Sequence, residues 1–103
     1  MPLYLDEIWL TDPTNTEQLK QFVDLFTTVA KNPSEAGVPS EVKVVAGPWI
    51  SNEEAKLVMV IDIPDHSKTV PVFMTTVAKG LVEKRRLQPL VDWNEFQKLA
   101  DSL

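Results

Sequence analysis

The chain has 103 residues, of which 44% are hydrophobic and 24% are charged, and its formal net charge at pH 7 is -5. This length predicts one domain over residues 1–103, because two separate hydrophobic cores would not fit. The acidic balance argues against nucleic-acid binding, which depends mainly on basic side chains that meet phosphates. The composition is that of an ordinary soluble globular protein.

Cysteine is absent and His66 is the only histidine. These counts exclude disulfides, thiolate zinc sites, a thiol nucleophile and any metal site with several histidine ligands. No segment approaches the ~20 consecutive apolar residues that a membrane-spanning helix needs. Residues 1–10 lack the basic region and the small-residue cleavage motif of a signal peptide. We therefore expect a cytoplasmic protein that contacts no membrane and carries no metal or other cofactor.

The N-terminal third predicts a strand followed by a helix. Residues 3–10, LYLDEIWL, alternate loosely between apolar and polar side chains and predict the first strand. Thr14 followed three residues later by Glu17 has the form of a capping box at the start of a helix. Apolar side chains then recur at helical spacing until Asn32 and Pro33, which end the helix.

Two further strands follow a polar loop at residues 33–41. The segment 42–50, VKVVAGPWI, predicts the second strand, and its Pro48 favours a sheet edge because proline cannot donate to a hydrogen-bonded ladder. The segment 56–63, KLVMVIDI, is the most apolar of the chain and predicts a central third strand. A hairpin between these two strands is the simplest connection.

The next segment, DIPDHSKTVPVF at residues 62–73, leads from the third strand into a second helix. Pro64 ends the strand, and Pro71 fits the first turn of the helix, because in mid-helix a proline costs about 3 kcal/mol. Either Thr69 or Ser67 is the expected cap of this helix. The apolar side chains at helical spacing are Val70, Phe73, Met74, Val77, Ala78 and Leu81.

The C-terminal part predicts a fourth strand and a short third helix. The second helix is expected to end at Gly80, the usual residue just past a helix end. The segment 82–91 predicts the fourth strand, and Pro89 again favours an edge position. Asp92 is the expected cap of a helix over residues 93–102, whose apolar stripe must lie on another surface. The stripe consists of Trp93, Phe96, Leu99, Ala100 and Leu103.

The order strand, helix, strand, strand, helix, strand is the split β-α-β pattern of ferredoxin-like folds. We therefore predict an α+β domain with a four-stranded antiparallel sheet, both longer helices on one face, and the short C-terminal helix in addition. Right-handed crossovers place the first and third strands at the centre and the second and fourth at the edges.

The strands are apolar on both sides, so the reverse face of the sheet needs a cover. Tyr4, Ile8, Val58 and Val60 are expected on this face. A sheet with one wet face shows cleaner alternation, and a monomer rarely exposes several hundred Å² of contiguous apolar surface. The same face of a second copy is the simplest cover, and it produces a homodimeric α/β barrel. The alternative cover is the C-terminal helix of the same chain.

Three short motifs fall at turns and strand ends of this pattern: GPWIS before the central hairpin, VIDIPD before the second helix and LQPLVD at the end of the last strand. Together with the element order over residues 3–91 and the chain length, they resemble an uncharacterised family of the dimeric α/β-barrel superfamily. That superfamily includes small antibiotic-biosynthesis-type monooxygenases and muconolactone-isomerase-like proteins. The resemblance implies a ligand pocket between sheet and helices or within the barrel, and chemistry that needs no metal or flavin.

Asp6 and Glu7 are carboxylates in the middle of the apolar first strand, so one of them should lie near each face. Burial raises the pKa of a carboxyl group, which would allow it to act as a base. Asp6 is therefore a candidate catalytic residue. The alternative, which we favour, is that one of the two pairs with Arg85 or Arg86 on the neighbouring fourth strand or lies at the rim of the dimer.

His66, Asp65 and Asp62 are close in the sequence and could form a small polar cluster at the end of the sheet. His66 would then be a candidate acid or base, and Asp62 a candidate ligand-binding residue. The three residues have no recognised metal-ligand spacing, so no metal site is predicted. We favour a local role instead, in which Asp65 and Ser67 accept hydrogen bonds from the free amides of a helix start.

Trp9, Trp49 and Trp93, together with Tyr4, are candidates to line a flat aromatic ligand, since ligand pockets are mainly apolar. Roles in the core or in a dimer interface are the favoured alternative, because large aromatic side chains carry much of the energy of interfaces. The predicted ligand-binding residues are Tyr4, Trp9, Trp49 and Asp62.

Two functions remain open. The first is a small homodimer that binds a small apolar or aromatic ligand without catalysis. The second is a cofactor-independent monooxygenase or isomerase that acts on an aromatic or quinone-like substrate. In that case Tyr4, Trp9, Asp6 or His66 would position the substrate and move a proton. The sequence contains neither a Gly-x-Ser-x-Gly elbow nor a glycine-rich phosphate loop, so it carries no known catalytic motif that would decide between them.

Overall fold

The structure of the protein is a computed structural model, and it describes residues 2–11 and 15–103. The strands within these residues are β1 (Leu3–Leu10), β2 (Lys43–Ile50), β3 (Lys56–Asp62) and β4 (Val82–Leu90). The helices are α1 (Thr16–Lys31), α2 (Val70–Ala78) and α3 (Trp93–Ser102), and two short 3-10 turns are η1 (Pro33–Ala36) and η2 (His66–Thr69).

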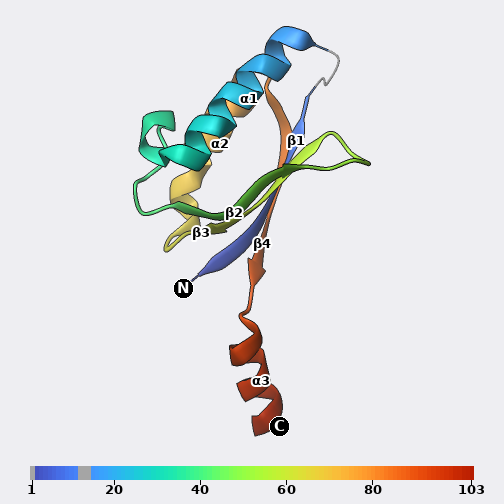
Figure 1. Cartoon of the computed structure of the whole chain (residues 1–103). Helices are drawn as coiled ribbons and strands as arrows, with labels where there is room; N and C mark the ends of the chain where they lie inside the picture. Colours follow the sequence, from blue (N-terminus) through green and yellow to red (C-terminus); the bar gives the residue numbers. More distant parts are fainter. Residues whose placement is uncertain (1, 12–14) are drawn as a thin grey trace.

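The four strands form one antiparallel sheet in the order β2-β3-β1-β4. Helices α1 and α2 lie on one side of this sheet (Figure 1). The predicted α+β class and the central position of the first and third strands are confirmed, and the arrangement is compatible with a ferredoxin-like order. Pro48 and Pro89 lie in the edge strands β2 and β4, as their missing N–H donors predict.

The ends of α1 are set by side-chain and backbone hydrogen bonds. The backbone N–H of Gln18 donates to Oδ1 of Asn15 at 3.0 Å, so Asn15 is the N-cap. The predicted cap, Thr14, lies outside the described residues. At the other end, Asn32 follows the last helical residue and donates its N–H to the carbonyl of Thr28 at 2.8 Å. The predicted end of this helix is confirmed.

The local account of the segment before α2 is confirmed for Asp65, whereas the hydroxyl of Ser67 donates to Asp65 and was not predicted to do so. Oδ1 of Asp65 accepts hydrogen bonds from the backbone N–H and the hydroxyl of Ser67, at 3.1 and 2.7 Å, and so caps the turn η2. Thr69 occupies the N-cap position of α2, although its side chain makes no capping bond there. Pro71 lies in the first turn, and Gly80 follows the helix with a φ of 74°.

The hydrophobic core lies between the sheet and the two helices α1 and α2. Many of its buried side chains come from the central strands and from the inner face of α1. They include Phe22, Phe26, Val29, Leu57, Met59, Ile61 and Ile63. This core occupies only one side of the sheet.

The pairing register of β1 and β3 decides which side chains face the core. Tyr4 pairs with Ile61, and only 5% of Ile8 is exposed. The expectation that Tyr4 and Ile8 share the reverse face with Val58 and Val60 is therefore wrong. Side chains alternate along a strand, so this register turns the even-numbered residues of β1 toward the helices.

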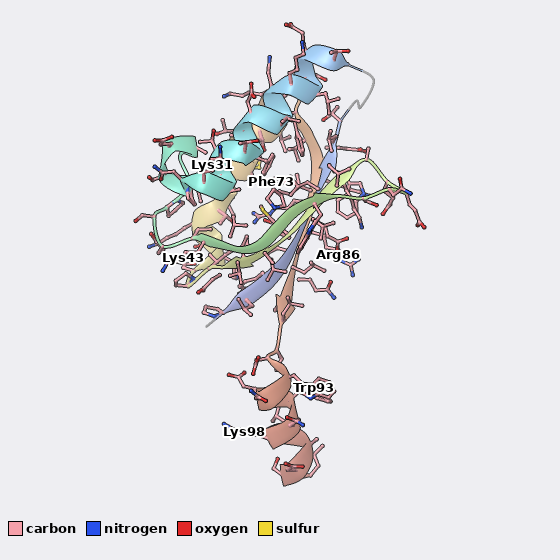
Figure 2. All side chains as sticks on the ribbon, in the orientation of Figure 1. Lys31, Lys43, Phe73, Arg86, Trp93 and Lys98 are labelled. Atoms are coloured by element: carbon pink, nitrogen blue, oxygen red, sulfur yellow. The ribbon has the colours of Figure 1, made fainter. Side chains whose placement is uncertain are left out.

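The reverse side of the sheet, which we call the open face, mixes apolar and charged side chains. In β1, β3 and β4 it consists of Leu3, Leu5, Glu7, Trp9, Lys56, Val58, Val60, Asp62, Lys84, Arg86, Gln88 and Leu90. Figure 2 shows Arg86 on this side, whereas Phe73 lies on the side of the helices. Neither α1 nor α2 covers the open face (Figure 1).

Helix α3 projects beyond the end of β4, away from the rest of the chain (Figure 1). Every residue of α3 is exposed. The alternative expectation, that the C-terminal helix shields the reverse face of its own chain, is therefore wrong. The radius of gyration is 15.0 Å, compared with about 13 Å for a compact domain of this size, because α3 lengthens the molecule.

Candidate functional site

The strongest candidate site is a buried ion pair between Asp6 and Arg85. Asp6 lies in the middle of β1 on the side of the helices and is 1% exposed. Arg85, on the neighbouring strand β4, donates from Nε to Oδ1 at 2.8 Å and from Nη2 to Oδ2 at 2.7 Å. This bidentate geometry is the strongest form of a carboxylate–guanidinium contact.

A threonine extends this pair toward α2. Nη1 of Arg85 donates to Oγ1 of Thr69 at 2.8 Å, and the Thr69 hydroxyl donates in turn to the carbonyl of His66 at 2.9 Å. These contacts therefore connect the central strand β1 and the edge strand β4 to the turn η2, which leads into α2. We refer to Asp6, Arg85 and Thr69 as the Asp6–Arg85–Thr69 cluster.

The cluster forms part of the wall of a cavity of about 50 Å³ between the sheet and the helices. The remaining wall is almost entirely apolar and includes Phe26, Met59, Val72 and Phe73. Thr76 also lines the cavity, but its hydroxyl donates to the backbone carbonyl of Phe73 at 2.7 Å. The polar groups of the cavity are thus concentrated at the cluster.

Burial controls the electrostatics of Asp6. It raises the pKa of the Asp6 carboxyl above its usual value of 3.8, because removal from water disfavours the charged form. The hydrogen bond and the positive charge of Arg85 lower this pKa without cancelling the effect of burial, and the nearby charge of Glu7 raises it further.

The cluster has hydrogen-bonding capacity to spare. A guanidinium has five N–H donors, and Arg85 makes three side-chain hydrogen bonds, to Asp6 and Thr69. Each oxygen of an ionised carboxylate can accept more than one bond. A hydroxyl or carbonyl group of a small ligand in the cavity could therefore be bound here while its apolar part contacts the walls.

The sequence candidates around His66 do not come together. The His66 side chain is exposed and its ring centroid lies 6.1 Å from that of Tyr4 in an edge-on arrangement. Asp65 caps the turn η2, and Asp62 lies on the open face opposite Leu3. Across residues 2–11 and 15–103, no group of three His, Asp or Glu side chains is placed to share a metal ion.

The three tryptophans are also separate from one another. Trp9 lies on the open face, where Nζ of Lys56 and Nζ of Lys84 are 5.0 and 4.7 Å from its ring centroid. Trp49, at the end of β2, is 57% exposed and lines a shallow groove of about 180 Å³ against α1, which we call the α1–β2 groove. Trp93 is exposed on α3 (Figure 2). The predicted ligand-binding residues Tyr4, Trp9, Trp49 and Asp62 thus line no common pocket.

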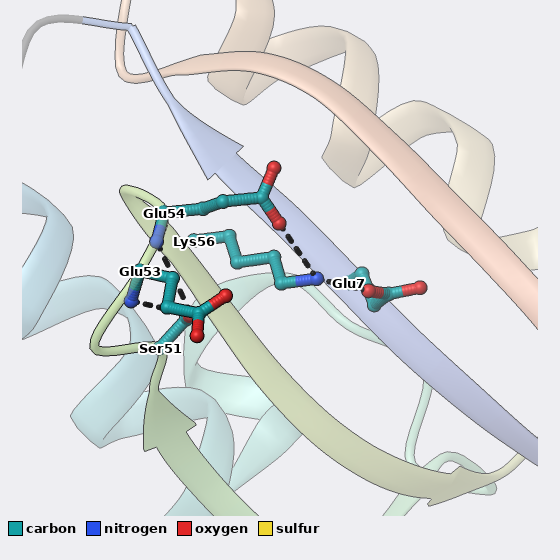
Figure 3. Close-up of polar contacts among 5 residues, drawn as sticks. All are labelled: Glu7, Ser51, Glu53, Glu54 and Lys56. Atoms are coloured by element: carbon teal, nitrogen blue, oxygen red, sulfur yellow. Dashed lines mark hydrogen bonds and ion pairs between the residues drawn. The ribbon is translucent and has the colours of Figure 1, made fainter.

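The second carboxylate of β1, Glu7, belongs to the open face and pairs with Lys56 (Figure 3). Lys56 also contacts Glu54 at 3.2 Å, and these interactions raise the pKa of the lysine, with Glu7 contributing most. The hydroxyl of Ser51 accepts the backbone N–H groups of Glu53 and Glu54 and so orders the β2–β3 turn. This network supports the turn and is separate from the cavity.

Sequence reasoning identified Asp6 and named Arg85 as one of two partners, but it gave Thr69 only a capping role and did not consider Thr76. A polar residue in an apolar strand was the signal for Asp6. Arg85 is likewise a polar residue at an inward-facing position of a strand. That position can be recognised only once the irregularity in the β1–β4 pairing between Trp9 and Leu10 is known, because the irregularity shifts the alternation that begins at Val82. Thr69 carried no such signal.

Comparison with known proteins adds no function to this geometry. No protein-family model matches the chain, and no curated protein sequence matches it. Among the described helices, none combines the length and the apolar character that crossing a membrane requires. The features that indicate a function are therefore the cavity, the Asp6–Arg85–Thr69 cluster and the exposed surfaces.

Removal of Arg85 tests whether the cluster is an integral part of the fold. Arg85→Met leaves the buried Asp6 carboxylate without its partner, and we expect a loss of about 3 kcal/mol in the free energy of unfolding at pH 7, measured with urea. The double variant Asp6→Leu/Arg85→Met should recover most of this loss, because it removes both charges. Lys68→Met is the matched control: it breaks the exposed 2.8 Å pair with Glu41 and should change stability far less. Equal losses in the two single variants would contradict the expectation.

The raised pKa of Asp6 predicts a specific pH dependence. Between the unfolded value of 3.8 and the higher folded pKa, the folded protein binds more protons at Asp6 than the unfolded chain does. The contribution of Asp6 to stability is therefore greatest below pH 3.8 and is lost as the pH rises through the folded pKa. Relative to Asp6→Leu/Arg85→Met, the native chain should gain unfolding free energy as the pH is lowered from 7 toward 4. A relative loss over that range would mean that Arg85 outweighs burial.

Proposed function

We propose that this protein is a small homodimeric α/β-barrel protein that binds a small apolar or aromatic ligand. The observation that carries the ligand-binding proposal is the position of the Asp6–Arg85–Thr69 cluster at the wall of an otherwise apolar cavity. Buried ion pairs contribute little net stability compared with apolar residues of the same volume. Stability alone therefore does not account for this ion pair, whereas a role in binding the polar group of a ligand does.

The cavity limits the size and polarity of the ligand. A cavity of about 150 Å³ holds benzene, so the cavity of about 50 Å³ is a third of that size and would admit a single ring only if its walls, such as α2, moved outward. The ligand needs one hydroxyl or carbonyl group to use the free donors and acceptors of the cluster. Phenols and quinones have both properties.

The open face supports the homodimer. Its apolar side chains include Leu3, Leu5, Val58 and Val60, and neither long helix of the chain covers them. Apposition of two open faces across a two-fold axis would bury both sets at once and close a barrel of two sheets. Membership of the dimeric α/β-barrel superfamily is part of this proposal.

A cofactor-independent oxygenase or isomerase is a second candidate. The observation in its favour is the raised pKa of Asp6 beside the cavity, since a carboxylate with a raised pKa is a stronger base. Asp6 would take the proton of a phenolic hydroxyl. Its bidentate contact with Arg85 opposes this role, because the contact occupies both carboxylate oxygens.

Ligand binding is tested by thermal unfolding with phenol, catechol and 1,4-benzoquinone at millimolar concentration. A ligand that binds only the folded state raises the midpoint, by several degrees at ~100 times its dissociation constant. Val72→Phe fills the cavity and should abolish the shift, whereas Val70→Phe, on the exposed face of the same helix, should retain it. Absence of any shift in the native chain, or an equal shift in both variants, would refute binding in this cavity.

Oxygen uptake with catechol separates the two functions with the same ligand. For a binding protein, we expect the rate to equal that of buffer. For an oxygenase, the rate exceeds that of buffer and falls to it in Asp6→Asn, which keeps the shape of the side chain but removes the base.

The homodimer is tested by sedimentation at low micromolar concentration. The native chain should sediment as a dimer, and Val60→Glu, which places a charge in the centre of the open face, should produce a monomer. Met74→Glu is the matched control, because Met74 is 56% exposed on α2, on the other side of the sheet. A native monomer, or a dimer that tolerates Val60→Glu, would exclude this interface.

A further inference from the structure

Helix α3 carries an apolar stripe that the described part of its own chain leaves largely exposed. Trp93 is 67% exposed, Phe96 50% and Leu99 60%, and Leu103 just beyond the helix is fully exposed. The rings of Trp93 and Phe96 lie 5.3 Å apart and form one continuous aromatic surface. Figure 2 shows Trp93 projecting into open space from the far end of the molecule.

A helix of this length is not stable on its own. Isolated helices shorter than ~12–15 residues are marginal in water, and α3 has ten residues. The side chain of Asp92 accepts the N–H of Asn94 at 3.1 Å and caps the helix, but one cap does not compensate for the missing packing. The stripe must therefore be covered if α3 is to persist as a helix.

The attachment point of α3 restricts what can cover it. The helix follows the end of β4, where Leu90 pairs with Leu3. This is the sheet end opposite to the β2–β3 turn. The direction of α3 continues that of β4 outward, so its stripe does not reach the open face of its own chain (Figure 1).

Charge favours the open face of another copy as the contact surface. The cap and helix carry the three carboxylates Asp92, Glu95 and Asp101 and only one lysine, Lys98. On the half of the open face near the β2–β3 turn, the three cations Lys56, Lys84 and Arg86 outnumber Glu7 and the nearby Glu54, which both pair with Lys56, so this half is weakly basic. It carries Trp9 with Lys84 at 4.7 Å from the ring centroid, Lys56 beside them, and the exposed Arg86.

We infer that α3 is an arm exchanged between the two copies of the proposed homodimer, on which this inference rests. The stripe of each α3 packs on the open face of the second copy, against Trp9 and the aliphatic parts of Lys84 and Arg86. A two-fold axis perpendicular to the strands makes the two sheets run in opposite directions. The end of one sheet that carries α3 then points toward the β2–β3 end of the other, where Trp9 is located. Because α3 extends beyond its own sheet, the two copies must also be offset along the strands for the arm to lie on Trp9.

The size of the arm matches this role. A stable interface buries about 800 Å² on each partner. Fully covered aromatic side chains bury about 150–250 Å² each, so the exposed parts of Trp93 and Phe96 alone supply on the order of 200 Å² per arm. The leucines of the stripe and the apolar residues of the open face would add to this area. Lysine and arginine stems can cover apolar surface while their charges remain in water.

A spin label on α3 tests the contact directly. Because the chain has no cysteine, Ser102→Cys provides a single labelling site at the end of the helix. Spin-labelled chains with natural-abundance nitrogen are mixed with ¹⁵N-labelled native chains, so that line broadening reports only contacts between copies. We expect the amide signals around Trp9, Lys84 and Arg86 to lose more than half their intensity. The same label at Lys79→Cys, in the turn after α2, should leave these signals unchanged.

Two other patterns of broadening overturn the inference. Signal loss confined to Trp49 and Ile50 would place the arm in the α1–β2 groove of the second copy. No signal loss in a sample that sediments as a dimer would mean that the arm is not exchanged, although the proposed homodimer would stand. A sample that sediments as a monomer would exclude both the homodimer and the exchange.

Matched variants of α3 measure the contribution of the arm. Phe96→Glu places a charge in the stripe and should raise the dissociation constant of the dimer at least tenfold in sedimentation equilibrium. Asn94→Glu adds the same charge on the opposite face of the helix and should change it less than threefold. Equal effects of the two variants would show that the stripe is not buried in the dimer.

Discussion

The ion pair between Asp6 and Arg85 is the interaction on which the candidate site depends. A carboxylate that is 1% exposed in the middle of a strand requires a partner, since an unpaired charge in the core would remove a large part of the small free energy of unfolding of a domain. Arg85 provides this partner from the next strand and also binds Thr69, which fixes the turn before α2. The same three residues form the polar part of an apolar cavity, so the group that holds the layers together is also the group that can recognise a ligand.

The two sides of the sheet differ in their side chains and in their packing. The helix side holds the core and the cavity, whereas the open face combines valines and leucines with a basic half around Trp9. The open face mixes apolar and charged side chains, and among the described residues neither α1 nor α2 covers it or the apolar stripe of α3. Their net charges differ in sign, because carboxylates outnumber lysine on the arm, whereas Lys56, Lys84 and Arg86 outnumber Glu7 and Glu54 near Trp9. One symmetric association would cover both surfaces.

Much of the fold was predictable because local signals agree with it. Proline and apolar content separated edge strands from central ones, and the segment around Asp65 and Pro71 was correctly interpreted as a helix start. The predictions failed where the answer depended on register. Tyr4 and Ile8 were assigned to the reverse face because both faces of β1 are apolar, and only pairing with β3 decides between them. The tryptophans were grouped by residue type, although the fold separates them.

The sequence by itself determined the helices and strands and their order, because helix periodicity, strand composition and turn residues act over a few neighbouring positions. It also showed that a charged residue, Asp6, lies in the middle of a largely apolar strand. Only the tertiary structure decided that Arg85 rather than Arg86 meets Asp6, that Thr69 joins them, and that α3 stands clear of the sheet. The choice between Arg85 and Arg86 depends on the pairing register of strands that are distant in the sequence, where a shift of one residue exchanges the two faces of the sheet.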